Sequence, residues 1–115
     1  MLAPIAAERT GDTGFSSIGI VAGATWPQEA KDLRRQLPSA PFLVPGFGAQ
    51  GAGPEKALAG LVRGDGVWEG GLINSTRGLI FPESAANATT IAQWQAAIAD
   101  TITENIAILN DFASA

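Results

Sequence analysis

The chain alternates short apolar runs with segments of helical periodicity, and this alternation restricts the fold more than any other sequence feature. The apolar runs cover residues 18–22, 42–44 and 72–73, and a helix signal follows each of them. Strands that alternate with helices indicate βαβ units, a parallel sheet and right-handed crossovers. The runs are almost continuously apolar, which is typical of strands whose two faces are both covered. The sequence therefore predicts an α/β fold.

The first helix is predicted to begin after Thr25, because Thr25 and Gln28 fit a T-x-x-Q capping box and Pro27 suits the first turn. Pro38 ends it. Its spacing gives one apolar face and other faces that carry the charges. The apolar face comprises Trp26, Ala30, Leu33 and Leu37, and the charged residues are Lys31, Asp32, Arg34 and Arg35. We expect the three tryptophans of the chain to be packing residues.

The second predicted helix starts at Pro54 and ends at RGDG, residues 63–66, with a narrow apolar stripe that includes Leu58 and Val62. The third follows a capping box at Thr90 and Gln93. Its apolar residues repeat at helical spacing as far as residue 112, which makes it the strongest helix signal in the chain. The segment before residue 18 is interpreted as a helix end and a linker.

Three parallel strands make a poor free-standing domain, because both outer strands have open edges. The pattern therefore fits either a doubly wound sheet or a stretch of a (β/α)8 barrel. A whole barrel takes about 250 residues, and this chain has 115. We interpret residues 1–115 as a single partial domain.

Composition excludes several classes of function. The net charge of −4 argues against binding to nucleic acid or to anionic membranes, which both require a basic patch. The chain has no cysteine and no histidine, so the commonest general base and the commonest metal ligands are absent. No apolar run reaches the roughly 18 residues of a membrane span, and the start lacks the features of a signal peptide. We expect a cytoplasmic protein without a metal site.

The loop PGFGAQGAG, which follows the second apolar run, is the first candidate site. Gly46, Gly48 and Gly51 allow positive φ angles and a close approach of the backbone to an anion. N–H groups in such a loop near a helix start can bind phosphate, and the Gln50 amide can donate to a phosphate oxygen. An ordinary tight turn is the alternative. The loop matches neither a Walker motif nor a G-x-G-x-x-G fingerprint.

The second candidate site is NSTRG, residues 74–78, at the end of the third apolar run. An arginine beside free N–H groups at the carboxyl end of a strand suits a phosphate dianion. The alternative for Arg77 is a surface salt bridge to Glu83 or Asp65.

Thr25 lies at the carboxyl end of the first run and is a third candidate for the same pocket, although helix capping is the favoured role. The carboxylates are scattered along the chain, and we find no acid/base pair among them.

These three sites together resemble a known family. VAGATWPQEAKDLRRQLPSAPFLVPGFGAQGA, followed by GGLINSTRGLIF, is similar to the C-terminal part of orotidine 5'-phosphate decarboxylases whose last strands read GAT-P-E, FLVPG-GAQG and N-S-[ST]-R-G. The resemblance runs from about residue 18 to residue 81, and the last helix fits the closing helix of that barrel. The order and spacing of the motifs carry the resemblance, since no single motif is specific enough.

The resemblance implies a (β/α)8 barrel, usually a homodimer, that converts orotidine monophosphate to UMP in pyrimidine biosynthesis without metal or cofactor. In this family a glutamine and an arginine hold the substrate phosphate, and these correspond to Gln50 and Arg77. The backbone at Gly48 and Gly78 is expected to assist, and Pro45 is expected near the pyrimidine.

The chain departs from the family at the catalytic motif. The family's lysines and aspartates lie around D-x-K-x-x-D on early strands, and this chain contains no such motif. Lys31-Asp32 and Lys56 do not match it. We therefore predict the C-terminal portion of a TIM barrel, with about three of the eight βα units and a long closing helix, which is inactive without the missing N-terminal half.

Two other hypotheses remain open at this stage. The chain could be a phosphate-binding module without catalysis. It could also assemble with itself by pairing edge strands between copies.

Overall fold

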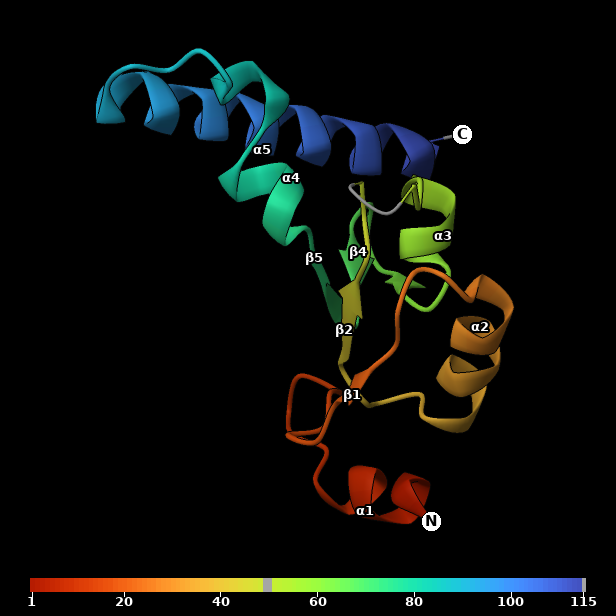
Figure 1. Cartoon of the computed structure of the whole chain (residues 1–115). Coiled ribbons are helices and arrows are strands. Elements are labelled where there is room, and N and C mark those ends of the chain that lie inside the picture. The colour runs from red at the N-terminus through yellow and green to blue at the C-terminus, as the bar shows by residue number, and fades with distance from the viewer. Residues whose placement is uncertain (49–50, 115) are drawn as a thin grey trace.

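The computed structural model describes residues 1–48 and 51–114, and its helices and strands alternate as predicted except between α3 and β5 (Figure 1). The elements are α1 (Leu2–Glu8), β1 (Ile20–Val21), α2 (Pro27–Gln36), β2 (Phe42–Pro45), α3 (Pro54–Leu58), β3 (Val62–Arg63), β4 (Trp68–Glu69), β5 (Gly71–Asn74), α4 (Thr76–Ile80), the 3-10 helix η1 (Glu83–Ala85) and α5 (Ile91–Ser114).

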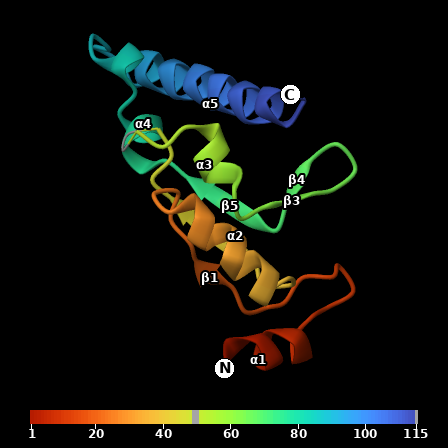
Figure 2. The same ribbon diagram turned by 90° about the vertical axis from the view of Figure 1, so that its right-hand side faces the viewer.

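The described residues form a parallel sheet in the order β1-β2-β5, so the α/β prediction is confirmed. β2 is the central strand, and its Phe42 aligns with Ile20 of β1 and Gly71 of β5. Leu43, one residue further, aligns with Val21 and Leu72. Helices α2 and α3 lie on the same side of this sheet, in front of the strands when the molecule is turned (Figure 2).

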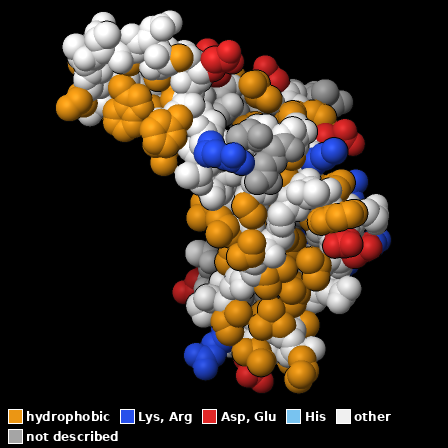
Figure 3. All heavy atoms as spheres, in the orientation of Figure 1, with side chains coloured by type: hydrophobic (Ala, Val, Ile, Leu, Met, Phe, Trp, Pro, Cys, Tyr) orange, Lys and Arg blue, Asp and Glu red, His pale blue; other side chains and the backbone are white. Residues whose placement is uncertain are grey.

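The two faces of the sheet differ, and the expectation that both are covered is wrong for the described residues. Side chains alternate along β2, so Phe42 and Val44 are buried on the side of the helices, at 1% and 2% exposure. The row made by Val21, Leu43 and Leu72 points the other way, with exposures of 68%, 42% and 75%. We call these three residues the bare row. Hydrophobic side chains gather in the lower part of the space-filling view, over the region of β1 and β2 (Figure 3).

The region between α3 and β5 differs from the prediction. Helix α3 ends at Leu58, and β3 and β4 form an antiparallel hairpin around the RGDG turn. Gly60, two residues after the helix end, packs so closely on β2 that a Cβ there would lie only 2.9 Å from the Phe42 ring. The Gly64 N–H then donates to the Val67 carbonyl across the turn. The two-residue strands of this hairpin give no periodic signal in the sequence.

The start of α2 also differs, and the capping box predicted at Thr25 is wrong. The helix begins at Pro27, its N-cap residue is Trp26, and no side chain caps it. Gln28 donates instead to Asp32 within the helix, at 3.3 Å. Trp26 is 66% exposed, so it is not a packing residue.

Arg34 is buried, although the sequence pattern places it on a charged face of α2. It is 9% exposed, and its guanidinium lies 3.9 Å from the centre of the Phe42 ring. Within the described part of the chain it donates to the backbone carbonyls of Leu37, Pro38, Ala40, Gly60 and Gly70. Burial lowers the pKa of Arg34 from its usual value. This guanidinium joins the end of α2, the end of α3 and the amino ends of β2 and β5.

The long last helix is confirmed as α5, and it lies across the carboxyl end of the sheet, above α3 and α4 (Figure 1). Trp94 attaches its first half, because the indole Nε1–H donates to the Ile80 carbonyl at 2.9 Å. Much of its apolar stripe stays open, as Ile91, Ile106 and Phe112 are 73%, 54% and 40% exposed. Within the described residues no helix is both long and apolar enough to cross a membrane.

Candidate functional site

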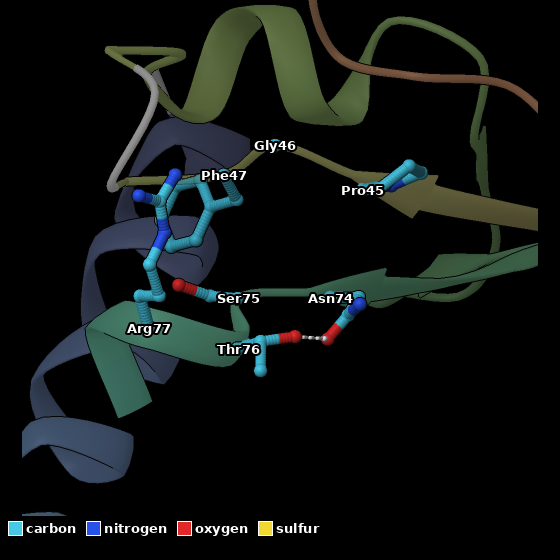
Figure 4. Close-up of a pocket in the computed structure, with 7 residues that line it drawn as sticks. All are labelled: Pro45, Gly46, Phe47, Asn74, Ser75, Thr76 and Arg77. Atoms are coloured by element: carbon cyan, nitrogen blue, oxygen red, sulfur yellow. Dashed lines mark hydrogen bonds between the residues drawn. The ribbon is translucent and has the colours of Figure 1, made fainter. Parts of the chain in front are cut away.

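An open pocket of about 340 Å³ lies at the carboxyl ends of β2 and β5 (Figure 4). Two loops from neighbouring strands form it. The first continues β2, and the second joins β5 to α4. Its lining residues are Pro45, Gly46, Phe47, Asn74, Ser75, Thr76 and Arg77. Two separate sequence motifs therefore meet at one place, because parallel strands in register bring their carboxyl ends to the same edge.

Arg77 is the charged side chain of this pocket. It is exposed, it stands in the first turn of α4, and it forms no ion pair with the residues that the structure describes. The salt bridges to Glu83 and Asp65 that were considered from the sequence are therefore absent from the described part of the chain. A guanidinium at this edge can receive an anion in a bidentate arrangement.

The glycine loop adopts the positive φ angles that its sequence predicts, at 98° for Gly46, 77° for Gly48 and 75° for Gly51. Two of its N–H groups are already used inside the loop. The Gly48 N–H donates to the Ala52 carbonyl at 3.1 Å, and the Gly51 N–H donates to the Gly48 carbonyl at 2.8 Å. In this conformation the Gly48 N–H is thus engaged within the loop, and its contact with a ligand stays a prediction. Gln50, the predicted amide donor, lies outside the described residues.

Pro45 lines the pocket, as expected, whereas Thr25 is exposed and is not among the lining residues. The end of β1 is nevertheless close, because the Ala24 N–H donates to the Pro45 carbonyl at 3.0 Å. Gly78 follows Arg77 within α4, and a Cβ at Gly78 would lie 2.8 Å from the Ser75 hydroxyl. The roles of Pro45, Thr25 and Gly78 toward a substrate remain predictions.

Sequence reasoning missed Ser75. The sequence pattern gives it no role beyond its place in NSTRG, yet it is 6% exposed and lines the pocket. The alternation of side chains along β5 could have indicated this burial. Ser75 follows directly after the strand and lies two residues after Ile73, so it falls on the same side of the sheet as Ile73. Its neighbour Thr76 is exposed, and the Thr76 hydroxyl donates to Asn74 Oδ1 at 3.3 Å.

The site contains no evident catalytic pair. Lys31 and Lys56 are exposed in α2 and α3, and neither lines the pocket. Among the residues that the structure describes, no group of three or more histidines, cysteines, aspartates or glutamates could hold a metal ion. The described lining of the pocket thus offers the cation of Arg77 and no acid/base machinery.

Comparison with known proteins confirms the resemblance that the motifs indicated. The chain is 44% identical over 86 residues to the orotidine 5'-phosphate decarboxylase of Halobacterium salinarum, a match that covers 75% of this chain and 29% of that protein. It is 51% identical over 69 residues to the enzyme of Haloarcula marismortui, covering 59% of this chain and 23% of the relative. The Clostridium perfringens enzyme is 43% identical over 75 residues, covering 65% and 25%.

These matches cover most of this chain but less than a third of each of these relatives. Among solved structures, a putative orotidine-monophosphate-decarboxylase from Toxoplasma gondii is similar, with 35% identity and a TM-score of 0.48, over 79% of this chain and 29% of that one. No family model matches.

Proposed function

We propose that this chain is the phosphate-binding part of an orotidine 5'-phosphate decarboxylase, a carbon-carbon lyase that converts orotidine monophosphate to UMP and CO2. The observation that carries the proposal is Arg77, an exposed arginine without an ion pair among the described residues, in the pocket where the loops of β2 and β5 meet. Gln50 would complete the contact with the phosphate. The names of the relatives supply the substrate.

The strand order supports a stretch of barrel rather than of a doubly wound sheet. Each new strand of the order β1-β2-β5 is added on the same side of the previous one, and α2 and α3 stay on the same face. A doubly wound sheet reverses this order at its centre and has helices on both faces. In a (β/α)8 barrel the inner face of the strands is filled by bulky side chains from other strands. The bare row would be part of that inner face.

The chemistry would come from the part of the enzyme that this chain lacks. The relatives are more than three times as long as the matched region, and the described lining offers no candidate for proton transfer. Binding energy from a remote phosphate can be used at the reacting centre of a substrate. The phosphate-binding end can therefore be separate from the catalytic residues. In the cell the complete enzyme would be a cytoplasmic homodimer.

The binding proposal is tested by following the amide NMR signals of the chain during titration with UMP and, separately, with uridine. We expect UMP to shift signals of residues 74–78, uridine to shift them far less, and Arg77→Ala to remove the difference. Arg35→Ala, in the exposed part of α2, is the matched control and should leave the titration unchanged. Equal responses to UMP and uridine would contradict a phosphate site.

The catalytic part of the proposal needs a separate assay. We expect no CO2 release from orotidine monophosphate by the pure chain. Activity should appear when a polypeptide with the remaining barrel units of the Halobacterium salinarum enzyme is added. Full activity of the pure chain would show that the catalytic groups lie within it and would overturn this division.

The bare row favours one alternative, a phosphate-binding fragment that assembles with itself and performs no catalysis. Its three apolar side chains lie side by side across the sheet, and β1 and β5 are both edge strands in the described structure. Such edges can pair between copies. Light scattering at rising concentration distinguishes the two: a strict monomer excludes self-assembly, and a discrete oligomer that does not bind the missing half supports it.

A further inference from the structure

Ser75 is a mostly buried polar residue whose hydroxyl makes no hydrogen bond to the residues that the structure describes. It is 6% exposed and stands at the N-cap position of α4, where serine normally caps through its side chain. Here no side-chain capping bond is formed. Within the described part of the chain, the Ser75 hydroxyl has no hydrogen-bonding partner. Among the described side chains only Trp68 Nε1 is both fully buried and unpaired, so the Ser75 Oγ still reaches the pocket, where it can donate to a bound group.

The surroundings of this hydroxyl are shaped by glycines of both pocket loops. A Cβ on Gly78 would lie 2.8 Å from the Ser75 Oγ, and a Cβ on Gly48 would lie 3.6 Å from it. A side chain at Gly78 would therefore displace the hydroxyl. The close-up shows the Ser75 hydroxyl on the same side of its strand as Phe47, while the Thr76 hydroxyl turns toward Asn74 (Figure 4). The hydroxyl thus faces the space between the two loops.

The position of Ser75 beside Arg77 indicates which chemical group its hydroxyl would bind. Both residues line the same pocket, two positions apart on the β5–α4 connection. An oxygen of a phosphate monoester would accept from the guanidinium and from the hydroxyl together, and hydrogen bonds to such charged acceptors are short and strong. A neutral ligand group would gain much less from this pair.

We infer that Ser75 Oγ–H donates a hydrogen bond to the phosphate group that Arg77 binds, and that Ser75 is thereby a ligand-contacting residue of the site. The inference rests on the proposed phosphate-binding function. It adds that the Ser75 hydroxyl stands at the pocket without a hydrogen-bonding partner among the described residues before the ligand binds. Its removal should therefore weaken binding and leave the free protein no less stable.

The test compares Ser75→Ala with Ser84→Ala, an exposed serine of η1 outside the pocket. UMP and uridine affinities are measured by calorimetry, and thermal unfolding is measured without ligand. We expect Ser75→Ala to weaken UMP binding about tenfold, the usual effect of losing one hydrogen bond to a charged group. Uridine binding and the unfolding temperature should not fall. Ser84→Ala should behave as the unchanged chain.

A second variant tests the position of the hydroxyl. Gly78→Ala should weaken UMP binding because its methyl group displaces the Ser75 Oγ. The same substitution in the Ser75→Ala background should cause little further loss, since the displaced atom is gone. Independent effects of the two substitutions would contradict this geometry.

The outcomes separate this inference from the function on which it rests. Loss of UMP binding in Arg77→Ala with unchanged binding in Ser75→Ala would overturn the role of Ser75 alone. Equal weakening of UMP and uridine, or a lower unfolding temperature of Ser75→Ala, would assign the hydroxyl to holding the loops and would also overturn it. Absence of UMP binding by the unchanged chain would overturn both.

Discussion

The two ends of the sheet each present an arginine, and the two arginines are in opposite situations. At the amino ends of the strands, Arg34 is 9% exposed and saturated by backbone carbonyls from segments far apart in sequence. At the carboxyl ends, Arg77 is exposed and has no ion pair with the described residues. The same side chain stabilises the fold at one end and is available to a ligand at the other.

Both residues are arginines, so the partners of the guanidinium, and not the residue type, indicate the role of each one. Among the described residues the guanidinium of Arg34 meets neutral acceptors and an aromatic ring, so no anion is needed to satisfy it. Arg77 lies where parallel α/β sheets usually bind ligands, outside the carboxyl ends of the strands.

Removing each arginine should affect stability very differently. Arg34→Ala leaves several buried carbonyls without a donor, and each can cost about 1–3 kcal/mol. We expect a loss of roughly 3 kcal/mol or more in the free energy of unfolding, measured with urea. Arg77→Ala should change it by less than about 0.5 kcal/mol, as is usual for exposed residues. Equal effects would show that the two ends are not specialised in this way.

The two faces of the sheet give a second contrast. Phe42→Ala should cost about 3–5 kcal/mol, because it leaves a cavity beneath Arg34. Leu72→Ala should cost less than about 1 kcal/mol in the isolated chain, since Leu72 is already 75% exposed. Thermal unfolding of both variants checks this. A large effect of Leu72→Ala would mean that the bare row is covered in solution, and that the chain has paired with another copy.

The smallest effect concerns the backbone at the carboxyl end. Gly48→Ala places a side chain at φ 77°, which costs about 1–2 kcal/mol. Gly23→Ala is the matched control, because a Cβ there would lie at an ordinary 3.9 Å from the Pro45 carbonyl oxygen. Urea unfolding should separate the two. No difference between them would mean that the loop after β2 readjusts freely, and that its shape is not fixed before a ligand binds.

The alternation of strands and helices could be predicted because it depends on local signals. β2 and β5 fall on apolar runs, and α5 has a long repeat of apolar residues. The meeting of the two loops at one pocket also followed, since carboxyl ends of parallel strands share an edge. Arg77 was found at this edge for that reason.

The rest depends on contacts between segments far apart in the chain. The charge of Arg34 predicts a surface residue, but Arg34 shares one face of α2 with Ala30 and Leu37. Carbonyls from 26 and 36 residues further along the chain accept hydrogen bonds from its guanidinium there. The capping box at Thr25 was a valid local signal, yet the helix starts two residues later at Pro27. Ser75 likewise lies close to a residue of another loop, since a Cβ on Gly48 would be 3.6 Å from its Oγ.

β2 lies at the centre of the core and also supports the pocket, so a change in the core can alter the pocket. A slip of β2 by one residue would exchange Phe42 for Leu43 on the helix side, and it would carry Pro45 and the glycine loop past their neighbours on β5 by one residue length. The packing of the core thus fixes the position of the pocket loops along the strand direction. A substitution that changes the volume of a core side chain under the helices could then lower the affinity for the ligand, although every residue in the pocket is intact.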